Sequence, residues 1–112
     1  MSYDLGLWVG QTPNSDKEAA DEFERRFAQA EDDDSSDAEP AIEAFVAEAV
    51  DKFPEFDDGS PWASLPVMLG ATGDFISVSL TVPGAVHAAE IARIGASNGL
   101  VCYDPQREDL LP

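Results

Sequence analysis

The side chains that could carry chemistry in this 112-residue chain are few and scattered. The only histidine, His87, and the only cysteine, Cys102, could form a base and a nucleophile, but no motif or spacing supplies a third group. The adjacent carboxylates Asp57-Asp58 could act as general acid and base or hold magnesium, yet such pairs arise by chance among 23 acids. Residues 70–73 lack the lysine of a phosphate loop, and no Cys/His cluster indicates zinc. We therefore expect no metal and no cofactor, and favour a protein that is not an enzyme.

Aromatic residues near acids say more about function than the candidate reactive groups do. Trp62 follows an acidic loop, and Trp8 lies in an alternating segment on the same side as Asp4. Both tryptophans could close the rims of a core. Alternatively, they belong to an aromatic and acidic patch that engages a basic partner, because aromatics and complementary charge mark protein interfaces. The predicted partner-binding residues are Asp4, Trp8, Asp57, Asp58, Trp62, Ser77 and Ser79.

Two strands must position these residues. From Asp74 to Val82 the side chains alternate strictly, with aliphatic residues on one side and Ser77 and Ser79 on the other, which is typical of a half-buried strand. The segment from Tyr3 to Val9 alternates in the same way. Its Gly6 offers no side chain to pack, which often marks a bulge or a close approach by something else.

Helices and shorter strands complete the prediction. Ser15 and Glu18 form a capping box ahead of a helix with an apolar stripe through Phe23 and Phe27. Pro40 suits the first turn of a second helix. The remaining predicted features are the end of the second helix at Phe53, a short strand at 67–69, a third helix at Ala85–Asn98, a last strand at Leu100–Tyr103, a mobile acidic loop at 31–39 and a frayed tail at 107–112.

This order predicts one α+β domain over residues 1–112: a two-layer sandwich with a four-stranded, mainly antiparallel sheet and the helices on one face. The βααββαβ order is ferredoxin-like with one additional helix, and right-handed crossovers give the sheet order 4-1-3-2. A different edge order is the alternative. Either version leaves the face with Asp4, Trp8, Ser77 and Ser79 open.

The charge balance restricts the class of partner. There are 6 Lys+Arg against 23 Asp+Glu, a formal net charge of −17. Such a surface repels phosphate backbones and anionic lipid, so we expect no nucleic acid and no membrane as partners. It attracts basic proteins, although solubility or an acidic proteome also explains the charge. The single cysteine and the lack of a signal peptide or a membrane-length apolar run predict a cytoplasmic protein.

Three stretches resemble one family. They are Ser2-Tyr3-Asp4-Leu5, Asp58-Gly59-Ser60-Pro61-Trp62-Ala63-Ser64 and Gly99-Leu100-Val101-Cys102-Tyr103-Asp104-Pro105-Gln106. They resemble small uncharacterised bacterial proteins, common in actinobacteria, with a "YDL.VW" start, an "SPWA" loop and a final strand reading GLVCYDPQ. The likeness covers nearly the whole chain and implies no activity. By analogy the family is similar to immunity proteins of bacterial toxin systems, which are small, acidic and non-enzymatic.

Independently of this likeness, Asp104 has a physical interpretation. An aspartate before proline is held extended, and its side chain can cap nearby backbone amides. We predict this structural role for Asp104 rather than a binding role.

Together these observations favour a non-enzymatic interaction domain that binds a basic protein, with an immunity protein blocking a cationic toxin as its most specific form. The alternatives are a small-ligand-binding or enzymatic domain that uses the open sheet face, and a homodimer formed by packing of that face. The expected state is a monomer or a homodimer.

Overall fold

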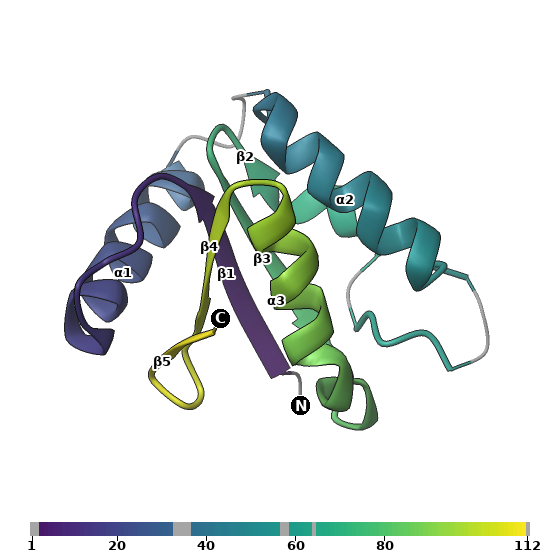
Figure 1. Cartoon of the computed structure of the whole chain (residues 1–112). Helices are drawn as coiled ribbons and strands as arrows, with labels where there is room; N and C mark the ends of the chain where they lie inside the picture. The colour runs from purple at the N-terminus through teal and green to yellow at the C-terminus, as the bar shows by residue number, and fades with distance from the viewer. Residues whose placement is uncertain (1–2, 33–36, 57–58, 64, 112) are drawn as a thin grey trace.

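A five-stranded antiparallel sheet runs through the computed structural model of the chain, which describes residues 3–32, 37–56, 59–63 and 65–111. The strands lie in the order β2-β3-β1-β4-β5, and three α-helices pack on the two faces in the described part (Figure 1). In chain order the elements are β1 (Tyr3–Val9), α1 (Asp16–Asp32), α2 (Pro40–Lys52), the 3₁₀ helix η1 (Val67–Gly70), β2 (Ala71–Thr72), β3 (Phe75–Leu80), the 3₁₀ helix η2 (Pro83–His87), α3 (Ala88–Ser97), β4 (Leu100–Asp104) and β5 (Asp109–Leu111).

The register of β1 against β3 sets the two faces of the sheet. Leu5 lies opposite Val78 and Asp4 lies opposite Ser79, so aliphatic residues share one face and polar residues the other. The alternation in the sequence predicted this division correctly.

Helices α2 and α3 cover the aliphatic face. Phe45 of α2 and Ile91 of α3 are fully buried against Leu5 and Leu7 of β1. Gly95 of α3 permits this close contact, because an added Cβ would lie 2.5 Å from a methyl carbon of Leu7. Of the two hydrophobic clusters that the described residues form, the larger lies on this side.

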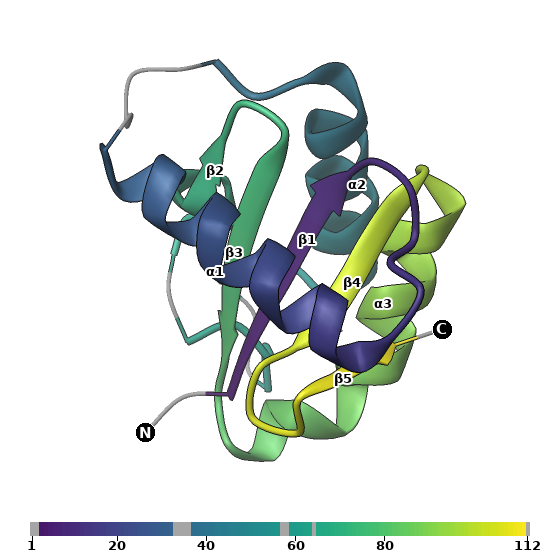
Figure 2. The same ribbon diagram turned by 90° about the vertical axis from the view of Figure 1, so that its left-hand side faces the viewer.

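Helix α1 covers much of the opposite face, so the prediction that all helices lie on one face is wrong. In Figure 1 the strands separate α1 from α2 and α3, and in Figure 2 α1 crosses diagonally in front of β3, β1 and β4. The physical reason is the missing side chain of Gly6, where an added Cβ would lie 2.4 Å from two ring atoms of Phe23. Phe23 fills this gap and packs with Phe75 and Tyr103. The molecule therefore has three layers, not two.

The beginnings of α1 and α2 follow the sequence signals. The backbone N–H of Glu18 donates to Ser15 Oγ at 3.1 Å, and the Glu18 carboxylate accepts from the N–H of Asn14 at 3.0 Å, which confirms the predicted capping box. Pro40 occupies the first turn of α2, and the helix ends with Phe53 as its C-cap, as predicted.

Other expected elements differ. The predicted four-stranded count and ferredoxin-like order are not confirmed, because the sheet has the fifth strand β5 at Asp109–Leu111, where we expected a frayed tail. Residues 67–69 belong to η1 instead of a strand, and the short β2 follows it. Of the acidic segment 31–39, residues 31 and 32 end α1, and the backbone N–H of Glu39 bonds the carbonyl of Gly73 at 2.8 Å; residues 33–36 lie outside the described part.

The outer sides of β3 and β5 carry contacts from elsewhere in the chain. The backbone N–H of Ala63 donates to the carbonyl of Ser79 at 2.8 Å, and that of Thr81 donates to the carbonyl of Pro61 at 2.8 Å. The backbone N–H of Leu110 in β5 donates to the carboxylate of Asp16 at 3.0 Å. Within the residues described, no helix has the length and apolar character needed to cross a membrane.

Candidate functional site

The polar residues predicted to share one sheet face do so. In the register of β1 against β3, Asp4 faces Ser79 and Gly6 faces Ser77. Phe23 of α1 lies over Gly6. Past this contact, the beginning of β1 and the end of β3 remain accessible, and all three polar side chains are half-buried there.

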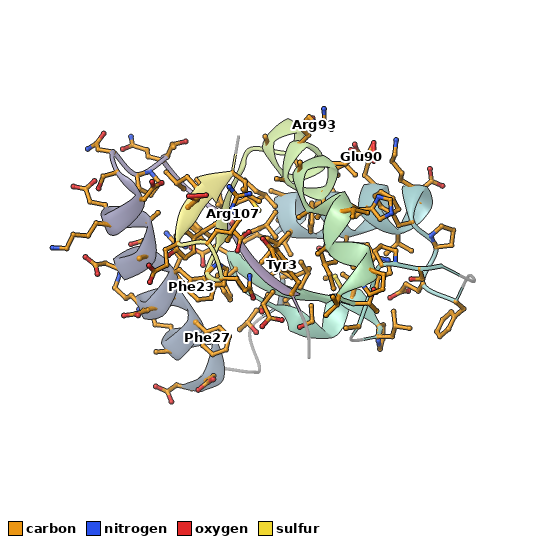
Figure 3. The ribbon with its side chains drawn as sticks, turned by 90° about the horizontal axis from the view of Figure 1, so that it is seen from below. Tyr3, Phe23, Phe27, Glu90, Arg93 and Arg107 are labelled. Atoms are coloured by element: carbon orange, nitrogen blue, oxygen red, sulfur yellow. The ribbon has the colours of Figure 1, made fainter. Side chains whose placement is uncertain are left out.

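An open pocket lies between this part of the sheet and α1. Its volume is about 460 Å³. Figure 3 shows Phe23 and Phe27 projecting from α1 toward the sheet. We call this site the Asp4 pocket; it is lined by Asp4, Phe23, Phe27, Ser77, Ser79, Pro105 and Gln106.

The carboxylate of Asp4 is held in place from two directions. Ser79 donates its hydroxyl to Asp4 Oδ1 at 2.7 Å. The side-chain amide of Gln106 bonds both backbone groups of Asp4, accepting from its N–H at 2.7 Å and donating to its carbonyl at 2.7 Å. Gln106 thus pairs with the beginning of β1 as a neighbouring strand would, and fixes the position of the carboxylate.

Asp104 in turn positions Gln106. Its side chain is 1% exposed, and Oδ1 accepts hydrogen bonds from the backbone N–H of Gln106 at 3.0 Å, from Gln106 Nε2 at 2.8 Å and from the N–H of Arg107 at 3.1 Å. Its Oδ2 accepts the hydroxyl of Tyr3. Burial and this bond raise the pKa of Tyr3 to about 12. The predicted capping role of Asp104 is confirmed.

Phenyl rings form the other side of the pocket. Phe27 packs on Phe23 with ring centroids 5.7 Å apart and meets Phe75 edge-on at 6.3 Å. These contacts orient Phe27, yet 38% of it stays exposed. The pocket therefore presents an aromatic surface opposite the sheet residues.

The two tryptophans are buried. Trp8 is 1% exposed beneath α1, so the prediction that it lies on an uncovered face is wrong. Trp62 is 4% exposed, and its indole N–H donates to the carbonyl of Phe53 at 2.7 Å. Neither side chain can contact a partner in this conformation. Asp57 and Asp58 lie outside the described residues.

Sequence reasoning missed four lining residues of the Asp4 pocket, namely Phe23, Phe27, Pro105 and Gln106. Phe23 and Phe27 were identified as an apolar stripe, and Gly6 was the available signal for what that stripe covers. Gln106 had no signal beyond its position after Asp104-Pro105, because its contact with Asp4 spans 102 positions of sequence.

The other candidate groups do not assemble a reactive site. Burial, followed by the charge of Asp104, raises the pKa of the Cys102 thiol, which disfavours the thiolate that a nucleophile needs. The ring of His87 packs against Phe53 with centroids 4.8 Å apart. Within the described ranges, no group of three or more His, Cys, Asp or Glu residues is arranged to hold a metal ion.

Comparisons with protein-family models, curated proteins and solved structures found no match. The resemblance to the bacterial family therefore stays a prediction, and the function has to be argued from the Asp4 pocket and the charge.

Proposed function

We propose that this chain is a non-enzymatic acidic interaction domain that binds a basic protein partner. The observation that carries the proposal is the uncompensated negative charge. The chain has 23 acids and 6 bases. Four of these bases, Arg25, Arg26, Lys52 and Arg107, already form ion pairs with carboxylates of the chain itself.

A charge of −17 on a domain of this size produces a strong negative potential. This potential accelerates the encounter with a basic protein and weakens as salt screens it. The predicted contact residues that this proposal retains are Asp4, Ser77 and Ser79; Trp8 and Trp62 serve the core. An immunity protein that neutralises a cationic toxin is the most specific form of the proposal, supported by the small size and acidity of the chain.

The test is affinity capture followed by titration of the purified partner at several salt concentrations. We expect a basic partner whose affinity falls steadily between about 50 and 200 mM salt, where the Debye length shortens from roughly 14 to 7 Å. Lysozyme serves as a basic reference protein of unrelated function. A partner bound no more tightly than lysozyme, or one whose affinity does not change with salt, would contradict the proposal.

A second candidate function is binding of a small ligand. The Asp4 pocket favours it, because its volume of about 460 Å³ falls within the range of ligand sites. Homodimerisation through an open sheet face loses its support, because α1 occupies much of that face. Titration with a free arginine derivative, compared with capture of a basic protein, separates a small ligand from a protein partner.

A further inference from the structure

The Asp4 pocket combines a fixed carboxylate, neighbouring hydroxyls and exposed aromatic surface. We propose that it receives one arginine side chain of the basic partner, an inference that rests on the proposed function. The guanidinium group would pair with the carboxylate of Asp4 and lie against the ring of Phe27.

The carboxylate is held in place before any ligand arrives. Its Oδ1 accepts the hydroxyl of Ser79 at 2.7 Å, and Gln106 fixes the backbone of Asp4 through two bonds of 2.7 Å. A charged group held in this way loses little conformational entropy when a cation binds. Its negative charge also selects against anionic ligands.

The aromatic side of the pocket suits a flat cation. Phe27 is oriented by its contacts with Phe23 and Phe75, and 38% of it remains exposed. A cation over the face of a phenyl ring gains roughly 0.5–1 kcal/mol at an exposed site. Arginine fits better than lysine because its planar guanidinium stacks on rings and donates to a carboxylate in a fixed geometry.

Within the described residues, α1 already carries this combination at Arg26. Arg26 donates to Glu22 at 2.6 Å and to Asp74 at 2.7 Å, while its guanidinium carbon lies 5.8 Å from the ring centroid of Trp8. Carboxylates and an aromatic ring thus contact the half-buried guanidinium of Arg26. The Asp4 pocket offers a carboxylate and a phenyl ring to a guanidinium from another molecule.

The first experiment uses small probes whose chemistry differs at one point. N-acetyl-arginine amide is titrated into the ¹⁵N-labelled protein, and backbone amide shifts are followed by NMR. N-acetyl-citrulline amide has nearly the same shape without the charge, and N-acetyl-lysine amide keeps the charge without the planar group. We expect shifts at Asp4, Ser79 and Gln106, with arginine binding about tenfold more tightly than citrulline and severalfold more tightly than lysine.

Variants then test each contact. Asp4→Asn keeps the size of the side chain and should weaken arginine binding about tenfold, since it removes the charge. Phe27→Leu keeps apolar bulk without the ring and should weaken binding about two- to fivefold. Asp51→Asn, an exposed site on α2 across the sheet, removes the same charge elsewhere and should change the affinity less than twofold. Thermal unfolding verifies that each variant is folded, and Ser79→Ala provides a second test of the carboxylate should Asp4→Asn be unstable.

The outcomes distinguish this inference from the proposed function. Equal affinities for the arginine and citrulline probes would overturn the inference that the Asp4 pocket binds arginine. Equal losses of arginine affinity in Asp4→Asn and Asp51→Asn would overturn it as well. If a basic partner then still binds in a salt-dependent manner, the proposed function stands without the pocket. If the arginine probe binds as expected but no basic protein does, the Asp4 pocket binds a free ligand. That result would refute both the proposed basic partner and the inference that an arginine of this partner enters the pocket.

Discussion

Replacing Gly6 by alanine tests whether α1 packs on the polar face of the sheet. The added Cβ would lie 2.4 Å from two ring atoms of Phe23, well inside contact distance. The ring cannot swing aside freely, because Phe75, Tyr103 and Phe27 pack around it with centroid separations of 6.1, 5.4 and 5.7 Å. Overpacking of this kind costs about 1–3 kcal/mol.

Whether Gly6→Ala is less or more stable than wild type decides whether Phe23 of α1 packs over Gly6. In a strand without a steric conflict, alanine is more stable than glycine by roughly 0.5–1 kcal/mol. The clash should outweigh this gain and leave Gly6→Ala less stable by about 1–2 kcal/mol, which lowers the melting temperature by about 4–8 °C.

Thermal and urea unfolding, followed by far-UV circular dichroism, measure this difference. The matched control is the double variant Gly6→Ala/Phe23→Leu, in which the smaller side chain makes room for the methyl group. The double variant should lose less unfolding free energy than the sum of the losses in Gly6→Ala and in Phe23→Leu, by about 1 kcal/mol. A Gly6→Ala protein that melts at or above the wild-type temperature would refute the packing of α1 described above.

Two further predictions concern the contacts behind the Asp4 pocket. Tyr3→Phe removes a donor from the buried carboxylate of Asp104 and should cost about 1–3 kcal/mol at neutral pH. Because the pKa of Tyr3 rises from 10.0 to about 12 on folding, the stabilisation by this bond is complete below pH 10 and disappears between about pH 10 and 12. Urea unfolding at several pH values should therefore show the unfolding free energies of wild type and Tyr3→Phe converging over that interval. A difference that stays constant with pH would count against the bond. Gln106→Glu would place a negatively charged oxygen against the carbonyl of Asp4 and the buried carboxylate of Asp104, which both accept from the Gln106 amide, whereas Gln106→Ala removes the amide without adding repulsion. Gln106→Glu should therefore unfold more easily than Gln106→Ala, and the reverse order in thermal melts would show that the amide does not hold β1.

The strands and their facing residues were predictable because alternation is a local signal. Leu5 and Val78 share one face and Asp4 and Ser79 the other, as the period of two requires. Asp104 was predictable for a similar reason, since its partners Gln106 and Arg107 follow it directly in the sequence.

The side of the sheet that α1 covers was not predictable from periodicity. A stripe through Phe23 and Phe27 buries equally well on either face, and the serines of β3 indicated a solvent-facing surface. The decisive feature is the missing Cβ of Gly6, which matters only once a specific ring lies over it. β5 escaped prediction because three residues are too few to establish a period.

The same limit applies to the candidate site. Its sheet residues followed from register, whereas its aromatic side and Gln106 depend on contacts between distant segments. Phe27 meets residues of β3, and Gln106 meets Asp4 across 102 positions. Such contacts leave no trace in local spacing.

The hydrogen bonds along the outer strands bear on how the protein associates. A second molecule that tried to lengthen the sheet would find the carbonyl of Ser79 and the N–H of Leu110 occupied by Ala63 and Asp16. Growth into fibrils by strand addition is thereby discouraged without any help from another protein. The complex proposed above should consequently form through side chains and leave the hydrogen exchange of the backbone ladder unchanged.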